Sequence, residues 1–200
     1  MKKYFTFSAW LPLLQKLGKE KQKIISSQTL ERASGLSRAA ARKAVQRLAR
    51  RGQLIKLYKK IYANKFYLPS LEEVAMFYGK PCYISFESAL ADFGIISQLP
   101  LLLTCATTRK LKNLKTPLGE IVFHHIKPRL FNNFENDRGI LRATAEKALL
   151  DFLYISLKNK RLIPALDEFN LSQLNRKKIK MAAKIFPQSV RDALRKSRLD

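Results

Sequence analysis

The apolar positions at the start of the chain are grouped in short segments that predict small helices and strands. Apolar side chains cluster over residues 10–17 and predict a first helix, in whose first turn Pro12 is tolerated. Residues 23–26 are short and β-branched, which favours a small strand. The chain is therefore expected to begin with a helix followed by a strand.

Two further helices are predicted, with a tight turn between them. Ser27 is a candidate N-cap for a short helix over residues 28–34, which ends at Gly35. Ser37 is a second N-cap, and residues 38–51 are rich in Ala and contain no Gly or Pro. Two helices joined by a short turn that contains Gly predict a helix-turn-helix.

The second of these helices is amphipathic, and Gly52 is expected to end it. Its inward side is predicted to hold Ala41, Ala44, Val45 and Leu48. Its other side is basic and carries Arg38, Arg42, Lys43, Gln46, Arg47 and Arg50. An α-helix fits the major groove of DNA, where Arg and Lys donate to guanine and Gln pairs with adenine. The alternative is a solvated helix face, but such faces usually mix charges of both signs at i,i+4 spacing.

A β-hairpin is predicted after the basic helix. Residues 53–58 and 61–67 are rich in β-branched and aromatic side chains, and Lys59 and Lys60 separate them. Because these two lysines lack Asn-Gly turn chemistry, the loop is open to being longer than two residues. A hairpin in this place is a wing, whose phosphate-binding lysines would be Lys56, Lys59, Lys60 and Lys65.

The composition changes after Pro69, so we expect a DNA-binding domain over residues 1–70 and a second domain over residues 71–200. The expected fold class is α+β, with an N-terminal winged helix-turn-helix and a small mixed α/β domain that ends in helices. The second domain is expected to contain strands over residues 101–108 and 121–126, and helices over residues 86–93 after Ser85, 145–157 after Thr144, 172–186, and 188–196 after Pro187.

The charge of the chain is concentrated in these outer segments. The 200 residues contain 39 Lys and Arg against 15 Asp and Glu, a net charge of +24. Residues 1–70 carry +15, residues 71–170 carry +2 and residues 171–200 carry +7. This segregation indicates a dedicated module for a polyanion, and duplex DNA is the expected partner.

Other chemistry is expected to be absent. His124 and His125 are adjacent on a presumed strand and point to opposite faces, and Cys82 and Cys105 have no metal-ligand spacing. We therefore expect no metal, no cofactor and no enzyme activity, and buried roles for the two cysteines. Glu87 and Glu146 stand near the starts of predicted helices, and their expected role is electrostatic stabilisation of these helices. No apolar run is long enough for a membrane helix and the basic start does not continue as a secretory signal, so a reducing cytoplasm is the expected compartment.

Several short motifs resemble those of the AbiEi-type antitoxin family, in the order in which that family has them. Residues 83–90, Tyr-Ile-Ser-Phe-Glu-Ser-Ala-Leu, resemble the Tyr-Val-Ser-x-Glu-Ser-Ala-Leu signature of this family. Residues 107–109, 116–119 and 145–151 are similar to later motifs of the family, and residues 50–55 and 61–63 to its winged-helix end. The chain departs from the family at Lys60, where a wing glycine is frequent, and at Phe93, where a histidine is common.

The resemblance implies an antitoxin of a type IV toxin–antitoxin system of the abortive-infection class, which acts in phage defence. Such antitoxins are transcriptional repressors of their own operon and bind inverted repeats in the operator. They also counteract a nucleotidyltransferase toxin, generally without a stable complex. The open alternatives are a transcriptional regulator whose second domain senses a ligand or dimerises, and an RNA-associated or nuclease-type enzyme.

Two sets of site residues follow from this interpretation. We expect Arg38, Arg42 and Arg47 to make base or groove contacts, and the wing lysines to contact phosphates. The full DNA-binding set is Ser37, Arg38, Arg42, Lys43, Gln46, Arg47, Lys56, Lys59 and Lys60. The candidate antitoxin surface, for which a solvated helix face is an equal alternative, is Arg176, Lys177, Lys178, Lys180 and Lys184.

Overall fold

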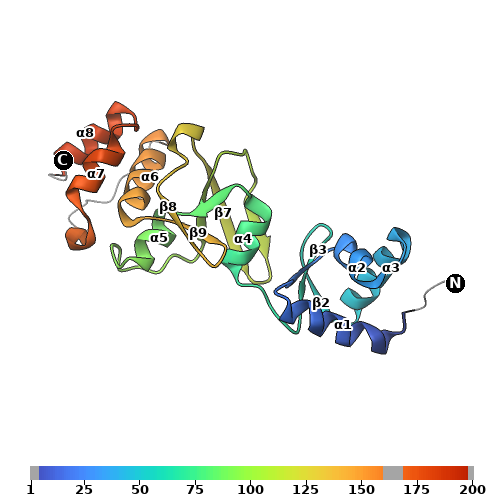
Figure 1. The fold of residues 1–200 in the computed structure, drawn as a ribbon. Coiled ribbons are helices and arrows are strands. Elements are labelled where there is room, and N and C mark those ends of the chain that lie inside the picture. Colours follow the sequence, from blue (N-terminus) through green and yellow to red (C-terminus); the bar gives the residue numbers. More distant parts are fainter. Residues whose placement is uncertain (1–4, 160–168, 198–200) are drawn as a thin grey trace. The chain divides into compact units, whose positions relative to one another are not determined.

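The computed structural model of the chain describes residues 5–159 and 169–197 (Figure 1). Residues 1–4 of the first expected domain, and residues 160–168 and 198–200 of the second, lie outside the described residues. The described residues form two compact units, one up to Val74 together with Leu114–Gly119, and the other comprising the rest. The fold is mixed α+β, which confirms the expected class. None of the described helices combines the length and the apolar character needed to cross a membrane.

The first unit is built from three helices and a three-stranded sheet. The elements are α1 (Phe7–Lys19), β1 (Ile24–Ile25), α2 (Ser27–Ser34), α3 (Arg38–Arg50), β2 (Leu54–Tyr58) and β3 (Ile61–Asn64), after which α4 (Leu71–Gly79) begins. The strand order is β1-β3-β2 and both pairings are antiparallel. Helix α1 begins at Phe7, so Pro12 lies well inside the helix and the expectation of a first-turn proline is wrong.

One hydrophobic core holds this unit together. It contains Trp10 and Leu14 from α1, Leu30 from α2 and Leu48 from α3, all at most 1% exposed. Asn64 is also fully buried at the end of β3, and its side-chain amide donates to the Leu14 carbonyl over 2.7 Å. The core therefore fixes α3 against both the other helices and the sheet.

The start of α2 differs from the sequence prediction. The N-cap is Ser26, because its hydroxyl accepts from the Thr29 amide and the Thr29 hydroxyl accepts from the Ser26 amide. This reciprocal capping box makes Ser27 the first helical residue. The predicted helix end at Gly35 is confirmed, since Gly35 is left-handed with φ of 67°.

The second sheet is mixed and six-stranded, with the order β6-β7-β5-β4-β9-β8, and all of its strands except β6 and the first residue of β7 belong to the second unit. The strands of this sheet are β4 (Cys82–Ile84), β5 (Leu103–Thr107), β6 (Leu114–Thr116), β7 (Gly119–His125), β8 (Phe134–Asp137) and β9 (Ile140–Ala143). The helices of the second unit are α5 (Phe86–Asp92), α6 (Ala145–Lys158), α7 (Arg176–Ala183) and α8 (Gln188–Lys196), with short 3-10 turns at Pro128–Leu130 and Leu171–Gln173. Strands β5 and β7 are parallel, as are β4 and β9.

Two predictions for this unit are wrong in detail. The single helix expected over residues 172–186 is a 3-10 turn followed by the shorter helix α7, because Asn175 caps a new start by accepting from the Lys178 amide. Ser85 precedes α5 as expected but makes no cap hydrogen bond, since its hydroxyl donates to Asp151 instead. The cap at Thr144 is confirmed, because its hydroxyl accepts from the Lys147 amide.

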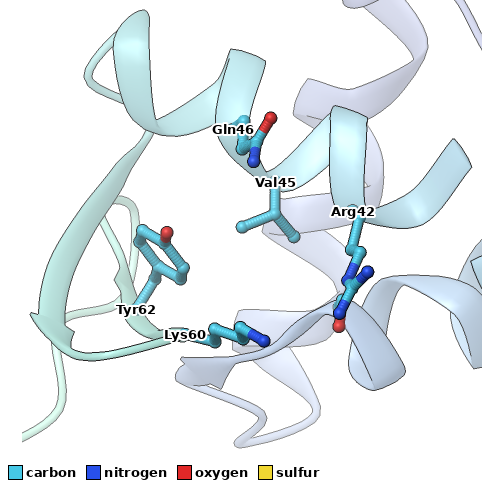
Figure 2. A pocket seen from close by; sticks show the side chains of 6 residues that line it. Arg42, Val45, Gln46, Lys60 and Tyr62 are labelled. Carbon is cyan, nitrogen blue, oxygen red and sulfur yellow. The ribbon is translucent and has the colours of Figure 1, made fainter. Parts of the chain in front are cut away.

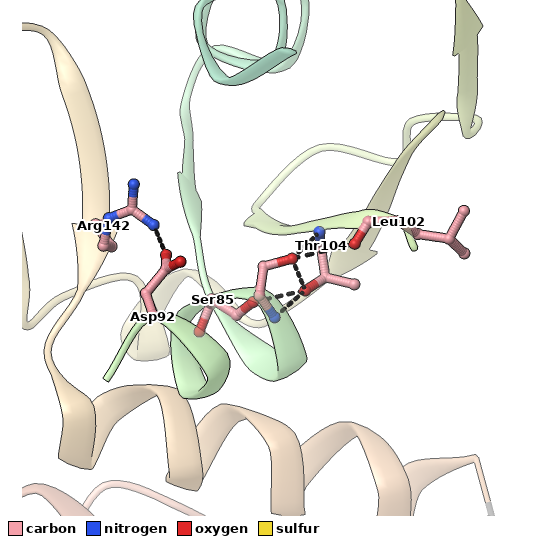
Figure 3. Close-up of polar contacts among 6 residues, drawn as sticks. Ser85, Asp92, Leu102, Thr104 and Arg142 are labelled. Atoms are coloured by element: carbon pink, nitrogen blue, oxygen red, sulfur yellow. Dashed lines mark hydrogen bonds and ion pairs between the residues drawn. The ribbon is translucent and has the colours of Figure 1, made fainter. Parts of the chain in front are cut away.

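Buried hydroxyl groups join α5 to the neighbouring strand β5 (Figure 3). The Thr104 hydroxyl donates to the Ser85 carbonyl over 2.7 Å and accepts from the Ser88 amide over 3.1 Å. Nearby, Asp92 at the end of α5 forms an ion pair with Arg142 of β9. These contacts hold α5 to the sheet from both of its ends.

Candidate nucleic-acid interface

Helix α3 owes its position to a side-chain cap at one end and buried alanines along one side. The Ser37 hydroxyl accepts from the Ala40 amide over 3.4 Å, which satisfies one of the free amides of the first turn. After the helix, Gly52 takes a left-handed conformation with φ of 66°, as the sequence predicted. The inward set is also confirmed, since all four of its members are buried: Ala41, Ala44, Val45 and Leu48.

The outward side of α3 is basic and solvent-exposed. With about 3.6 residues per turn, Lys43, Gln46 and Arg50 lie on the side opposite the buried alanines. Arg42 lies on the flank nearer the hairpin, and Arg47 on the opposite flank. The full set of exposed polar residues is Arg38, Arg42, Lys43, Gln46, Arg47 and Arg50. The helix therefore presents five cations and no carboxylate to solvent.

A two-residue turn at Lys59 and Lys60 connects β2 to β3 of the hairpin. The sequence alone did not decide the length of this loop. Tyr58 pairs with Ile61, so no additional residue enters the loop. Lys59 takes a positive φ of 42°, a conformation that glycine or asparagine adopts more easily. Its ammonium lies 5.2 Å from the centre of the Tyr58 ring. Both turn lysines and Lys56 are exposed.

A pocket of about 330 Å³ lies between α3 and this hairpin (Figure 2). Figure 2 shows the side chains of Lys60 and Tyr62 extending from the hairpin toward Arg42, Val45 and Gln46 of α3. The lining is completed by Ser27, the first residue of α2. Two cations and no carboxylate line the pocket, so its electrostatic potential favours an anion.

Arg47 lies in different surroundings, because it lines a small hollow of about 50 Å³ together with Phe7 and Trp10 of α1. In the same hollow the Arg51 guanidinium lies 4.2 Å from the centre of the Phe7 ring. Arg42 and Arg47, which the sequence analysis grouped with Arg38 as base or groove contacts, therefore lie in two different hollows on opposite flanks of α3.

The second candidate surface lies on α7. Ile179 and Ala183 are buried and turn one side of this helix inward. The five predicted cations are all exposed, and the described residues provide none of their side chains with a hydrogen bond or ion pair: Arg176, Lys177, Lys178, Lys180 and Lys184. Lys178 and Met181 also line a hollow of about 570 Å³ with residues of β8 and the start of α6.

A buried polar cluster in the second unit was not anticipated from the sequence. Lys147 and Asp151 form an ion pair one turn apart on α6, and both side chains are fully buried. The Lys147 ammonium also donates to the Tyr83 hydroxyl over 2.7 Å. Asp151 accepts from Tyr83 over 2.8 Å and from Ser85 over 2.9 Å. The cluster thus joins the motif at residues 83–90, which includes part of β4, to the motif at residues 145–151 on α6.

Burial controls the proton affinity of this cluster. Desolvation lowers the pKa of Lys147 and raises that of Asp151, while their mutual attraction opposes both shifts. Desolvation also raises the pKa of Tyr83 far above its ordinary value, and the nearby Asp151 carboxylate adds to this effect. Its hydrogen bonds join β4 and the following Ser85 to α6.

The remaining candidate residues have structural partners. Cys82 and Cys105 are buried and unbridged, which confirms the expected burial, and the Cys82 thiol donates to the Ala75 carbonyl. The His124 ring packs edge-on against Phe86. Glu146, in the first turn of α6, accepts from the amide of Asn175. Within residues 5–159 and 169–197, no three His, Cys, Asp or Glu side chains are grouped so that they could hold a metal ion.

Comparison with known proteins identifies a related fold. No protein-family model matches the chain, and no curated protein matches it. The structure is similar to the crystal structure of the Rv2827c protein from Mycobacterium tuberculosis, with a TM-score of 0.61. The similarity covers 94% of this chain and 75% of that one at 14% sequence identity, so it concerns the fold alone.

Proposed function

We propose that this chain is a DNA-binding antitoxin of a type IV toxin–antitoxin system. In this proposal the first unit is a winged helix-turn-helix, in which α2 and α3 are the two helices and β2–β3 is the wing. It binds inverted repeats in the operator and represses its own operon. The chain counteracts a nucleotidyltransferase toxin, without catalysis, a cofactor or a stable complex between the two proteins.

The observation that carries the DNA-binding part is the outward side of α3. Five exposed cations and a glutamine stand there without a carboxylate, on a helix whose opposite side is fixed in the core. The hairpin beside it carries exposed lysines at its tip. A rigid helix with basic and amide side chains suits the major groove, and a basic hairpin suits the neighbouring phosphates.

The antitoxin part rests on the family-like motifs and on the charge of α7. Arg176, Lys177 and Lys178 occupy the first turn of that helix, where the helix dipole disfavours cations. Arg176, Lys180 and Lys184 also follow one another at i,i+4 spacing, which is unfavourable for like charges. This arrangement of cations is electrostatically unfavourable in the free protein, and an anionic partner would relieve the repulsion. We therefore assign the basic surface of α7 to the antitoxin activity.

The test is co-expression of the chain with the product of the reading frame directly downstream, together with a reporter driven by the chain's own promoter. We expect that reading frame to encode a nucleotidyltransferase, that co-expression restores growth, and that the reporter is repressed. Repression without restored growth would instead favour a plain transcriptional regulator. Absence of both effects would contradict the proposal as a whole.

A further inference from the structure

The pocket between α3 and the hairpin contains a cation from each of these two elements. Arg42 comes from α3 and Lys60 from the turn of the hairpin, and both line the same cavity (Figure 2). The described residues provide neither side chain with a hydrogen bond or an ion pair. Two like charges that converge on one cavity repel each other, and this repulsion is relieved when an anion lies between them.

The rest of the lining fits a phosphodiester group. The Ser27 hydroxyl can donate to a phosphate oxygen, and α2 begins at Ser27, so its positive end lies at the pocket. Val45 and Tyr62 provide an apolar wall, against which a deoxyribose can rest. The volume of about 330 Å³ is sufficient for a phosphate together with an attached sugar.

The position of Arg42 on the helix supports this assignment. Lys43, Gln46 and Arg50 lie opposite the buried side of α3, so a helix inserted in the major groove presents these residues to the bases. Arg42 is turned away from them toward the hairpin, where the backbone of a duplex bound in this manner would pass.

On this basis, and resting on the proposed DNA-binding function, we propose that Arg42 and Lys60 clamp one backbone phosphate of the bound duplex in this pocket. Arg42 is then a phosphate contact, and base reading belongs to Lys43, Gln46 and Arg50. This differs from the sequence-based expectation, in which Arg42 was grouped with the arginines that read bases.

The first test measures how the affinity of the full chain depends on salt. The probes are a duplex from upstream of the chain's own gene and a shuffled duplex of the same composition. Each phosphate that the protein neutralises contributes about −0.9 to the slope of log K against log salt. Because R42Q and K60Q remove partners of the same phosphate, the double variant should reduce the slope by about 0.9 in magnitude, and not by twice that amount.

The clamp should also leave sequence discrimination unchanged. R42Q and K60Q should weaken binding to both duplexes by the same factor, whereas Q46A should reduce the ratio between them. A charge-matched control is K21Q/R32Q, which alters two exposed cations of the same unit that do not line the pocket. This control should change the slope less than R42Q/K60Q does.

The second test replaces single phosphates of the upstream duplex by neutral methylphosphonates, one position at a time. The unmodified chain should lose affinity at several positions in each half-site, and R42Q/K60Q should be insensitive at one of these positions. Persistent sensitivity of the double variant at every position would overturn the clamp, as would a lower discrimination ratio in R42Q. Failure of the unmodified chain to bind either duplex would contradict the proposed function itself.

Discussion

Replacing Lys147 by methionine tests whether the buried polar cluster holds the second unit together. The substitution keeps an unbranched side chain but removes the cation that forms an ion pair with the fully buried Asp151 carboxylate. Asp151 would keep the hydroxyl donors of Tyr83 and Ser85. Breaking a buried ion pair in this manner costs about 3–5 kcal/mol, a large fraction of the roughly 5–15 kcal/mol that stabilises a typical domain.

The loss of stability should depend on pH in a defined direction. Burial already raises the pKa of Asp151, and removing Lys147 takes away the largest effect that opposes this rise. A carboxyl group with a raised folded-state pKa binds more protons when folded, so its stability contribution is complete below the unfolded-state pKa and is lost as pH rises toward the folded-state pKa. K147M should therefore be less destabilised near pH 5 than near pH 8.

The assay is urea unfolding of the full chain, followed by circular dichroism at both pH values. The control is the double variant K147M/D151L, which removes both charges and should recover much of the lost stability. A cost below about 1 kcal/mol for K147M at pH 8, or a larger cost at pH 5 than at pH 8, would refute this reasoning.

Three further predictions concern other parts of the chain. Replacing Ser26 by alanine should cost about 1 kcal/mol of unfolding free energy through loss of the capping box, and S27A should cost clearly less in the same urea titration; equal costs would contradict the assigned cap. Replacing the buried Asn64 by alanine should lower the free energy of unfolding by about 2 kcal/mol. The Phe66 amide loses its acceptor, and the Leu14 carbonyl of α1 loses its hydrogen bond from β3. A change within experimental error would show that these hydrogen bonds do not stabilise the unit. Reversing the charges of α7 with K177E/K180E/K184E should weaken rescue from the toxin with little loss of stability. The control K110E/K112E/K127E alters exposed lysines of the same unit and should not weaken rescue. Equal rescue by both triple variants would show that α7 is only a solvated helix face.

The helices of the first unit could be predicted because their signals are local. Helix α3 has a capping serine, several alanines and a glycine that tolerates positive φ, all within one segment of the sequence. The cap of α2 was misplaced by one residue because Ser26 and Ser27 are adjacent. Only the position of Thr29 decides between them, since its hydroxyl completes the capping box with Ser26.

The second unit was predicted less well because its contacts are distant in sequence. Strand β4 has three residues and pairs with β5 and with β9, which lies about sixty positions later. Lys147 and Asp151 have the spacing of an exposed helix pair, although every residue of α6 from Glu146 to Ser156 is buried. Apolar side chains surround most of this helix, which is the pattern of a buried helix, and this signal could have indicated the buried cluster.

The sequence could predict which residues belong to the candidate sites, but not how their side chains are arranged in space. The sequence identified Arg42 and Lys60, which lie eighteen positions apart on a helix and in a turn. Their convergence on one pocket depends on the two-residue length of that turn, which the lysines themselves do not favour.

The most direct test of the central claim is the affinity of the full chain for the duplex upstream of its own gene, measured by fluorescence anisotropy beside a shuffled duplex at two salt concentrations. The account predicts that the upstream duplex binds at least about a thousand-fold more tightly than the shuffled one, and that raising the salt weakens binding to both. Equal affinity for the two duplexes, or an affinity that salt does not change, would contradict it.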